Sequence, residues 1–535
     1  MNYIEQSQSL LATQSQRRKI NQNIQKMAKL VAKKAPKLGD KEKILVFNAS
    51  TRITGLSLNA AFAMLTGWSL RLQGVQIINF VCQQGMSRCV MGTDRTDVYR
   101  LPPCQKCLAQ SKAIYSGSKV KRLIYSSSDE LARLLKDTSL DNLYHFRYDD
   151  IQLGDLCLPS MRWILRRHHL VDDEPTRALY RHFILSAYKV AMQFDWQLIT
   201  ESPRSVLVFN GMFFPEASAR WVARLRGIPV ISHEVGLAPF SGFFTEGEAT
   251  AYQVEIPETF QLNTAQEAQL DAYLSKRFEG DFSMAGIKFW PKMTMLDGDL
   301  LTKMNAFRQV VPIFTNVIFD TSQPHANVIF QDMFAWLDQI LNVIKAHPET
   351  LFVIRAHPDE ARPGKASLES VTVWIQERGV DKLPNVIFVG PEEYFSSYEM
   401  IQRAKFVMIY NSTIGMEAAI MGASVLCAGK ARFTQLDTVF FPKSQSEYLD
   451  LLEHFLESDA VVAPEEHRIN ARRFLYFQLF RTSLPFDHFL EPDGIWPGFV
   501  KLKDFALEDL LPERSPTLKV ISEGLLQGGD FLLPD

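Results

Sequence analysis

The sequence predicts an α/β protein of two domains, each a mostly parallel sheet covered by helices, facing each other across a cleft. Three observations favour this fold class. The chain has 535 residues, which is too long for one ordinary hydrophobic core. Apolar runs typical of buried strands alternate with helical patterns in both halves. Hydrophobic residues make up 46% and charged residues 22% of the chain, a composition typical of a globular protein with little disorder.

Charge and hydropathy exclude two classes of protein. The 58 Lys and Arg residues nearly balance the 60 Asp and Glu residues, for a formal charge of -2, so nothing in the charge indicates a nucleic-acid partner. No apolar run has the length of a membrane span or of a signal peptide. We therefore expect a cytoplasmic protein.

Residues 1–40 are predicted to form a basic amphipathic arm whose helix ends near Pro36. Its apolar residues recur at helical spacing, and they are Ile20, Ile24, Met27, Val31 and Ala35. Its basic residues are Arg17, Arg18, Lys19, Lys26, Lys29, Lys33, Lys34 and Lys37. One interpretation is peripheral contact with an anionic membrane, at the inner face of the cell membrane. The other is a helix docked on the protein's own surface.

Residues 41–300 are predicted to form an N-terminal Rossmann-like domain. Its expected strands are 44–47, 75–81, 206–209 and 228–232, and its expected helices are 56–72, 176–198 and 215–226. The order of the elements between 115 and 200 stays open. Weak periodicity places the crossing to the next domain within 251–308.

Residues 301–464 are predicted to form a second, doubly wound domain. Its expected strands are 311–319, 351–355, 386–389, 406–410 and 424–428, and its clearest helices are 328–345 and 414–421. Residues 465–535 are expected to be a helical tail.

Polar residues just after the predicted strands are candidates for ligand binding, because ligands of parallel sheets sit beyond the carboxyl ends of the strands. Arg355 and His357 follow one strand, and Pro358 stops that strand from continuing. A guanidinium and an imidazole at this place suit a phosphate. The alternative is structural, with Arg355 paired to a carboxylate and His357 capping a turn.

A second loop of this domain opens a helix with Asn411, Ser412 and Thr413. Unpaired N–H groups at a helix start attract anions, so the loop suits a diphosphate or a nucleoside monophosphate. Gly415 is expected to let a ligand approach the backbone, and Glu417 to accept hydrogen bonds from a ribose. The alternative is that the hydroxyl groups only cap the helix.

Two loops of the first domain carry a further candidate site. Asn210 and Gly211 follow one predicted strand, and His233 and Glu234 follow the next. Either His233 or Glu234 has the chemistry of a general base that deprotonates a bound hydroxyl. The alternatives are that these residues orient ligands by hydrogen bonds or stabilise the loop.

Six cysteines are present in the chain, and four of them are clustered in the sequence. The clustered residues are Cys82, Cys89, Cys104 and Cys107. Four thiolates suit tetrahedral zinc, although the first pair is wider than in a usual zinc ribbon. The interpretations are a structural metal, free or redox-active thiols and, less favoured, an iron–sulfur cluster. Cys157 and Cys427 are expected to be isolated core residues.

Three segments carry a resemblance to a known family. They are 352–358 (Phe-Val-Ile-Arg-Ala-His-Pro), 410–418 (Tyr-Asn-Ser-Thr-Ile-Gly-Met-Glu-Ala) and 422–425 (Gly-Ala-Ser-Val). Together they resemble the C-terminal half of capsule polysaccharide biosynthesis proteins, which are Kdo-transferase-like glycosyltransferases of the GT-B fold. Upstream, 209–211 and 233–236 are similar to the acceptor-side domain of that family.

The resemblance implies a GT-B architecture with two opposed Rossmann-like domains, an acceptor domain first and a nucleotide-sugar domain second. It also implies a CMP-activated acidic sugar such as Kdo, with His357 contacting the nucleotide phosphate and Ser412 and Thr413 at the matching Ser-Thr pair. Related GT-B enzymes that use UDP-sugars or CDP-polyols have a similar helix-opening loop, so the donor stays open. The family's acidic acceptor-domain motif has no clear counterpart here.

We therefore expect a glycosyltransferase that moves a sugar from a nucleotide-activated donor to a growing surface or capsule polysaccharide or a glycolipid. No cofactor is expected for the transfer itself, because the sequence shows no Asp-x-Asp metal site. One alternative is a nucleotide-sugar epimerase or polyol-phosphate transferase of the same fold. Another is a catalytically silent binding subunit of a polysaccharide assembly complex.

Overall fold

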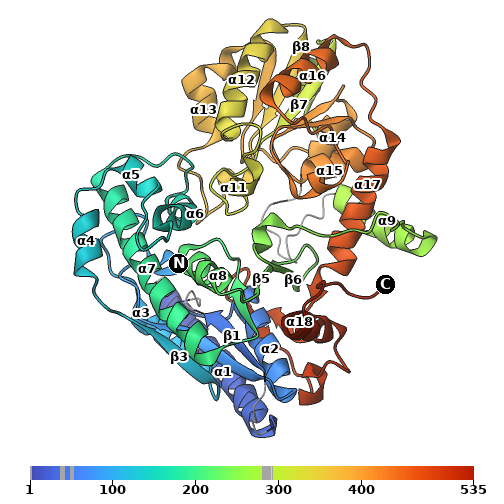
Figure 1. The fold of residues 1–535 in the computed structure, drawn as a ribbon. Helices are drawn as coiled ribbons and strands as arrows, with labels where there is room; N and C mark the ends of the chain where they lie inside the picture. Colours follow the sequence, from blue (N-terminus) through green and yellow to red (C-terminus); the bar gives the residue numbers. More distant parts are fainter. Residues whose placement is uncertain (1–2, 37–41, 49–52, 280–290, 292) are drawn as a thin grey trace.

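The computed structural model describes residues 3–36, 42–48, 53–279, 291 and 293–535. It contains two α/β domains, one above the other in Figure 1. The predicted arm residue Lys37 and the predicted boundary between residues 40 and 41 lie outside the described residues. The α/β fold class with parallel-dominated sheets is confirmed.

The N-terminal domain is built on a seven-stranded sheet in the order β12-β6-β5-β4-β1-β2-β3. Its strands are β1 (Lys43–Asn48), β2 (Gln76–Gln83), β3 (Lys119–Ile124), β4 (Ser205–Phe209), β5 (Val230–Val235), β6 (Ser241–Glu246) and β12 (Leu484–Pro485). The five strands from β3 to β5 are parallel, and Ile44 of β1 pairs with Ile77 on one side and Ser205 on the other. β6 and β12 complete the sheet as antiparallel strands.

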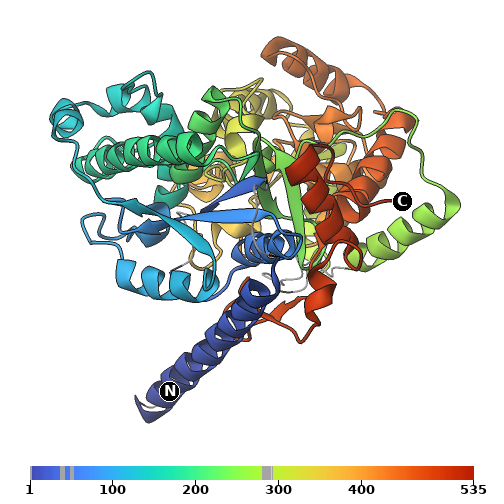
Figure 2. The same ribbon diagram turned by 60° about the horizontal axis from the view of Figure 1, so that its bottom comes forward.

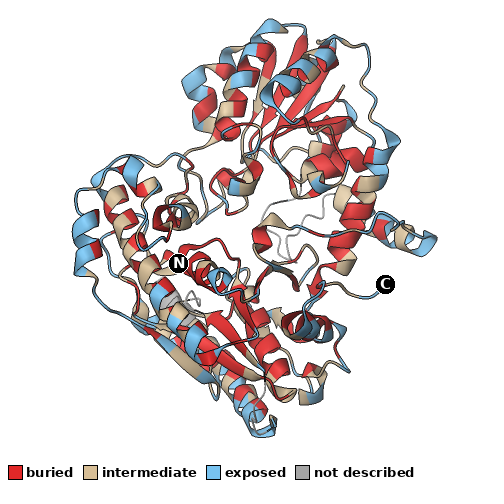
Figure 3. Ribbon diagram, viewed as in Figure 1, coloured by how far each residue is buried: buried red, intermediate tan, exposed pale blue. Residues whose placement is uncertain are grey.

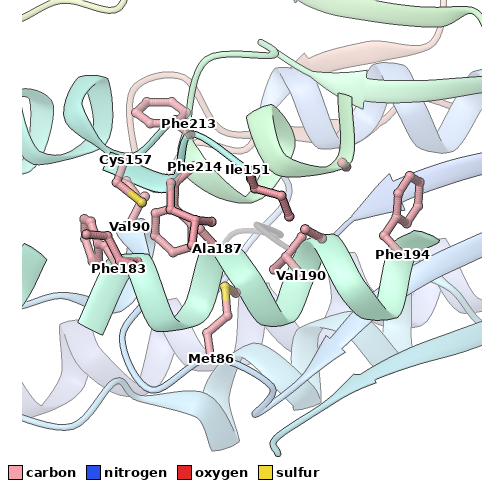
Figure 4. Packing of buried hydrophobic residues seen from close by; sticks show 14 of the residues in the cluster. Met86, Val90, Ile151, Cys157, Phe183, Ala187, Val190, Phe194, Phe213 and Phe214 are labelled. Atoms are coloured by element: carbon pink, nitrogen blue, oxygen red, sulfur yellow. The ribbon is translucent and has the colours of Figure 1, made fainter. Parts of the chain in front are cut away.

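Helices cover both faces of this sheet. They are α1 (Tyr3–Lys34), α2 (Leu58–Leu72), α3 (Cys104–Ile114), α4 (Asp129–Leu135), α5 (Leu140–Tyr144), α6 (Leu153–Leu165), α7 (Glu174–Glu201), α8 (Phe214–Leu225) and α18 (Pro516–Gln527). The long helix α7 buries Phe183, Ala187, Val190 and Phe194 in the core on one face (Figure 4). Residues 115–200, where the sequence left the order of the elements open, thus supply the edge strand β3 and helices α4 to α7.

The N-terminal helix α1 docks on the protein itself. Ile20, Ile24, Ala28 and Val31 are buried in the core that α2 also joins, while the N-terminal end of α1 projects away from the body (Figure 2). The apolar face that a membrane-bound helix would insert is therefore occupied over residues 20–31. Among the described residues, no helix combines the length and the apolar character needed to cross a bilayer.

The C-terminal domain is built on five parallel strands in the order β11-β10-β7-β8-β9. They are β7 (Gln309–Phe314), β8 (Thr350–Arg355), β9 (Val386–Val389), β10 (Val407–Ile409) and β11 (Val425–Cys427). The prediction of a strand over 311–319 was wrong at the C-terminal end of that range, because β7 ends at Phe314. After Phe314 the chain turns, because Thr315 donates its hydroxyl to the carbonyl of Arg355 and the Asn316 amide bonds to Asn411.

The helices around this second sheet include α9 (Thr264–Phe278) and the start of α10 (Gly298–Asn305), whose residues the sequence predicted to belong to the first domain. The others are α11 (Gln323–Ala326), α12 (Met333–Ala346), α13 (Val371–Arg378), α14 (Ser397–Gln402), α15 (Ile414–Ile420), α16 (Gln445–Glu457) and α17 (Glu465–Tyr476). Leu270 of α9 and Met304 of α10 are buried against C-terminal strands. The predicted boundary at residue 300 therefore falls too late.

The C-terminal tail differs from the helical segment expected. After α17 and a π-helical turn (Phe477–Arg481), it forms β12 and the hairpin β13 (Leu490–Pro492) and β14 (Val500–Leu502) before helix α18. Leu484 of β12 pairs with Gly242 of β6, so the chain returns to the first domain. These strands have two or three residues each, too few to show a period in the sequence. Figure 3 shows both sheets buried and the outer helices exposed.

Candidate functional site

A cleft of about 590 Å³ lies between the two domains. Its N-terminal side is formed by residues of α8, β5, β6 and the segment after β6, and its C-terminal side by the loops after β7, β8, β10 and β11. The charged and polar residues of its lining include Arg220, Arg224, Glu246, Glu248, Arg277, Asn316, Asp320, His325, His357, Asp359, Asn411, Ser412, Thr413, Lys430 and Arg432. The cleft therefore lies at the carboxyl ends of the second sheet, where ligands of such sheets bind.

His357 reaches the cleft from the loop after β8. Its Nδ1 accepts a hydrogen bond from the backbone N–H of Asp359, at 3.1 Å, so the neutral ring carries its proton on Nε2. Burial lowers the pKa of His357, which favours that neutral form at physiological pH. His357 caps a turn, as the structural alternative predicted, and it also borders the cleft.

The loop after β10 brings Asn411, Ser412 and Thr413 into the same lining. Thr413 occupies the N-cap position of the following helix, and its side chain makes no capping hydrogen bond there. Asn411 instead accepts a hydrogen bond from the amide of Asn316, at 2.7 Å. This bond fixes the loop after β10 to the loop after β7.

Gly415 has a different role from the one predicted. A Cβ atom added there would lie 2.2 Å from Cδ1 of Ile409, and both residues are buried. The glycine lets α15 pack closely on β10, and it does not belong to the described residues that border the cleft. The expectation that Gly415 admits a ligand to the backbone is therefore corrected.

Two of the predicted donor-site residues are not among the described residues that line the cleft. Arg355 is 4% exposed and donates to the backbone carbonyl of Glu393, at 3.3 Å; burial lowers its pKa to about 10. Glu417 is buried between Arg277, whose Nη2 lies 2.7 Å from Oε1, and the hydroxyl of Tyr398 at 2.5 Å from Oε2. Because Arg277 borders the cleft, Glu417 can position a cation there.

Several cations of the cleft were missed by the sequence reasoning. Lys430 follows β11 and is exposed, and no hydrogen bond or ion pair of its ammonium group is found within the described parts of the chain. Arg432 stacks on the ring of Tyr252, 4.0 Å from the ring centroid. Arg220 pairs with Glu248, whose other oxygen lies 3.1 Å from Nε2 of His325. Lys430, like His357, comes after the carboxyl end of a strand of the parallel sheet, so the same argument from the sequence could have identified it.

Glu234 lies at the junction of the two domains. Its carboxylate accepts hydrogen bonds from the amides of Asn59 and Asn210, each at 2.9 Å, and from the N–H of Val235 at 2.8 Å. The Asn210 amide also lies 3.4 Å from the hydroxyl of Thr321 in the other domain. Asn210 and Gly211 both have positive φ, at 60° and 86°, so this loop makes the tight turn that brings the amide to Glu234. Asn210, Gly211 and Glu234 are not among the described residues that line the cleft, so the prediction that they face it is corrected: they lie at its edge, next to Val235 and Gly236.

His233 lies behind this junction, in a smaller cavity of the first domain that Asn59 and Glu216 also line. It is 2% exposed and packs against the rings of Phe62, Phe209 and Phe244, and burial lowers its pKa to about 3. Among the described residues that line the interdomain cleft, His233 is not present. The prediction that His233 faces the cleft is therefore corrected.

The four clustered cysteines lie around one further cavity of the first domain. Burial, together with the nearby thiol of Cys82, raises the pKa of Cys89 to about 12 and of Cys107 to about 11. All six cysteines belong to the described residues and none forms a disulfide. Cys157 and Cys427 are buried in separate cores.

The two parallel-dominated sheets, the cleft between them and the polar strand-end loops define an α/β protein of the GT-B architecture. Among solved structures, the chain is similar to the Thermosulfurimonas dismutans KpsC beta Kdo 2,4 transferase. The identity is 10%, the match covers 53% of this chain and 81% of that one, and the TM-score is 0.33.

Two further solved structures match most of the chain. One is the UDP-GlcNAc 2-epimerase from Neisseria meningitidis bound to UDP-GlcNAc, at 13% identity, covering 82% of this chain and 99% of that one with a TM-score of 0.22. The other is Acinetobacter baumannii MurG, at 11% identity, 82% and 95% coverage and a TM-score of 0.26. No known protein family and no curated protein matches the sequence. Because these TM-scores are low, the chain's own sheets and cleft define the fold class.

Proposed function

We propose that the chain is a glycosyltransferase that moves a sugar from a nucleotide-activated donor to a surface or capsule polysaccharide or a glycolipid. The observation that supports this most is the convergence of His357, Ser412 and Lys430 on one side of the interdomain cleft, although they follow three different strands. An imidazole, a hydroxyl and an ammonium group together match the oxygens of a nucleotide phosphate. The motif resemblance favours a CMP-activated acidic sugar as the donor.

In this proposal the C-terminal side of the cleft stabilises the departing nucleotide. Negative charge develops on the nucleotide phosphate as the glycosidic bond breaks, and donors fixed in advance lower the energy of that state. His357 presents an Nε2–H donor because its Nδ1 is taken by Asp359, and Lys430 supplies a full positive charge. Arg277, held by Glu417, adds a second cation at the rim.

Glu234 is our candidate for the residue that activates the acceptor hydroxyl. It is half-buried at the junction of the domains, and the next residues, Val235 and Gly236, border the cleft. Its three hydrogen bonds hold the carboxylate in one orientation, as a general base requires. His233, enclosed by aromatic rings, supports β5 from behind.

The donor assignment is tested by calorimetric binding of CMP, CDP, UDP and GDP to the wild type, to His357→Ala and to His454→Ala. His454 is exposed on α16 of the same domain and serves as the matched control. One nucleotide should bind the wild type and the control alike. Its Kd should rise roughly 10-fold or more in His357→Ala, as expected for a lost hydrogen bond to a charged group. A well-folded wild type that binds none of the four contradicts the donor assignment.

The transfer step is tested by product analysis with the nucleotide-sugar of the base that binds. Glu234→Gln should lower kcat by about 100-fold or more and leave the nucleotide Kd unchanged. Formation of an epimerised nucleotide-sugar or of a polyol-phosphate product would favour the enzymatic alternative. Nucleotide binding without turnover would favour a binding subunit of a polysaccharide assembly complex.

A further inference from the structure

A cavity in the N-terminal domain, apart from the cleft, is lined by four cysteines from three chain segments. Cys82 lies near the end of β2, Cys89 precedes the turn Val90–Gly92, and Cys104 and Cys107 form the first turn of α3. The remaining lining residues are Ile53, Gln84, Met86, Met91, Gly92, Pro102, Pro103 and Leu108. No charged side chain belongs to this lining in the described part of the chain.

The local backbone directs N–H groups at cysteine sulfur in this cavity, although burial raises the pKa of all four thiols. The N–H of Gly85 points at Sγ of Cys82, at 3.4 Å, and the backbone N–H groups of Gln84 and Met86 also interact with that sulfur. Cys104 stands at the start of α3, an eleven-residue helix, where the helix dipole favours negative charge. Hydrogen bonds from N–H groups to cysteine sulfur are characteristic of metal–sulfur centres.

The loop that carries these cysteines is fixed by Arg88, which is 7% exposed. Its guanidinium donates to the carbonyls of Ser87, Val98 and Tyr99, at 2.8, 3.0 and 2.6 Å. Because this buried arginine donates hydrogen bonds to three backbone carbonyls, it holds Cys89 and the segment before Cys104 in place. Met86 of the same loop points toward α7 (Figure 4), which anchors the loop from its other side.

The spacing of the sulfurs distinguishes between metal centres. A single zinc ion with bonds of about 2.3 Å in a tetrahedron brings its four sulfurs to about 3.8 Å from one another. In the described residues, the group of three or more potential ligands within 4.8 Å of one another is His168, His169 and Asp332, and no three of the cysteine sulfurs meet that distance. An iron–sulfur cluster holds its cysteine sulfurs farther apart because several irons and sulfides lie between them.

We propose that Cys82, Cys89, Cys104 and Cys107 bind an iron–sulfur cluster in this cavity. The four side chains bind as thiolates, and their protons pass to solvent when the cluster binds. The metal supplies the positive charge that the apolar lining lacks. Met91 borders both this cavity and the neighbouring one that contains His233 and Glu216, so the cluster fixes the wall of the first domain behind the junction with Glu234.

The test is anaerobic purification of the full chain, followed by measurement of iron, acid-labile sulfide and zinc per chain and by visible absorption and Mössbauer spectra. Iron and sulfide in equal amounts, with sulfide-to-iron absorption, are expected in the wild type. Cys82→Ala and Cys107→Ala should lose most of both. Cys157→Ala, which changes a buried cysteine of the adjacent core, is the matched control and should retain them.

A second measurement keeps the test decisive if the variants do not fold. The wild type is bleached with an oxidant and a chelator and then rebuilt with ferrous iron and sulfide, while circular dichroism monitors the fold. Return of the absorption at the original stoichiometry supports the cluster. One zinc per chain without sulfide would overturn the proposal, as would a folded wild type that takes up neither iron nor sulfide.

Discussion

Nδ1 of His169 lies 2.6 Å from Oε1 of Glu369, and the two residues belong to different domains. Nε2 of the same ring lies 3.3 Å from Oδ2 of Asp332, also in the C-terminal domain. The other oxygen of Glu369 accepts the backbone N–H groups of His168 and His169, at 2.8 and 3.0 Å. One imidazole of the first domain is thus held between two carboxylates of the second.

This contact predicts a pH-dependent association of the domains. Hydrogen bonds to Asp332 and Glu369 raise the pKa of His169 from 6.5 to about 10. A pKa raised in the folded state adds stability that is complete below pH 6.5 and is lost as the pH rises through about 10. Because the ring is 55% exposed, we expect only about 1 kcal/mol after solvent screening.

His169→Gln should therefore lower the melting temperature near pH 6 and have little effect above pH 10. The measurement is thermal unfolding at both values. His145→Gln is the control, since His145 is 83% exposed and faces Asp155 within its own domain. Equal effects of His169→Gln at both pH values would contradict a charged imidazole.

Lys430→Ala is expected to weaken nucleotide binding by roughly 10- to 100-fold. The ammonium group borders the same cleft as His357, and loss of one charge contact to a phosphate is worth roughly 1.5–3 kcal/mol. Calorimetric titration at low and high salt checks this, and the loss should shrink as salt screens the charge. Lys345→Ala, at an exposed site on α12, should bind like the wild type.

Glu216→Gln is expected to stabilise the protein at alkaline pH. Glu216 is 1% exposed, neither carboxyl oxygen has a hydrogen-bond partner within the described structure, and burial raises its pKa from 4.5 to about 8. The wild type should lose stability as the pH rises from 4.5 through 8, because the buried carboxyl must then ionise. The neutral amide avoids that loss.

Urea unfolding at about pH 5 and pH 9 measures this difference. The gain from Glu216→Gln should appear at the higher pH alone, and Glu523→Gln on the exposed side of α18 should change neither value. A gain of equal size at both pH values would show that ionisation of Glu216 is not its cause.

Gly415→Ala should destabilise the C-terminal domain by about 1–3 kcal/mol, the usual cost of overpacking. The added methyl group would lie 2.2 Å from Cδ1 of Ile409. Ile409→Val removes that carbon atom, so the double variant should recover part of the loss in urea unfolding. Gly298→Ala, which has no neighbour within 4 Å, should be neutral or slightly stabilising.

The buried parallel strands could be predicted because they are continuous apolar runs between polar loops. β9 spans the residues predicted for it, and β8 differs by a single residue. β12 could not be predicted, because two residues are too few to show the alternation of a strand and because Leu484 pairs with Gly242, which is far away in the sequence. Long-range pairing of this kind leaves no local signal.

The site was predictable to the extent that strand ends determine position. His357, Ser412 and Thr413 reach the cleft because they lie beyond the last strand residue. Arg355 is itself the last residue of β8, so its side chain still follows the alternation of the strand and is buried. Glu417 was misjudged because its partner Arg277 comes from α9, whose packing the sequence does not reveal.

The final crossing of the chain has a consequence for biosynthesis. β12 is an edge strand of the N-terminal sheet, and Leu518 and Ile521 of α18 are buried in the core that α1 and α2 share. The N-terminal domain therefore lacks part of its own core until β12 and α18 have been synthesised. All strands of the second domain are synthesised before β12, so the second domain can complete its sheet before the first domain does. A chain shortened before residue 484 would expose the incomplete core of the first domain to chaperones and proteases.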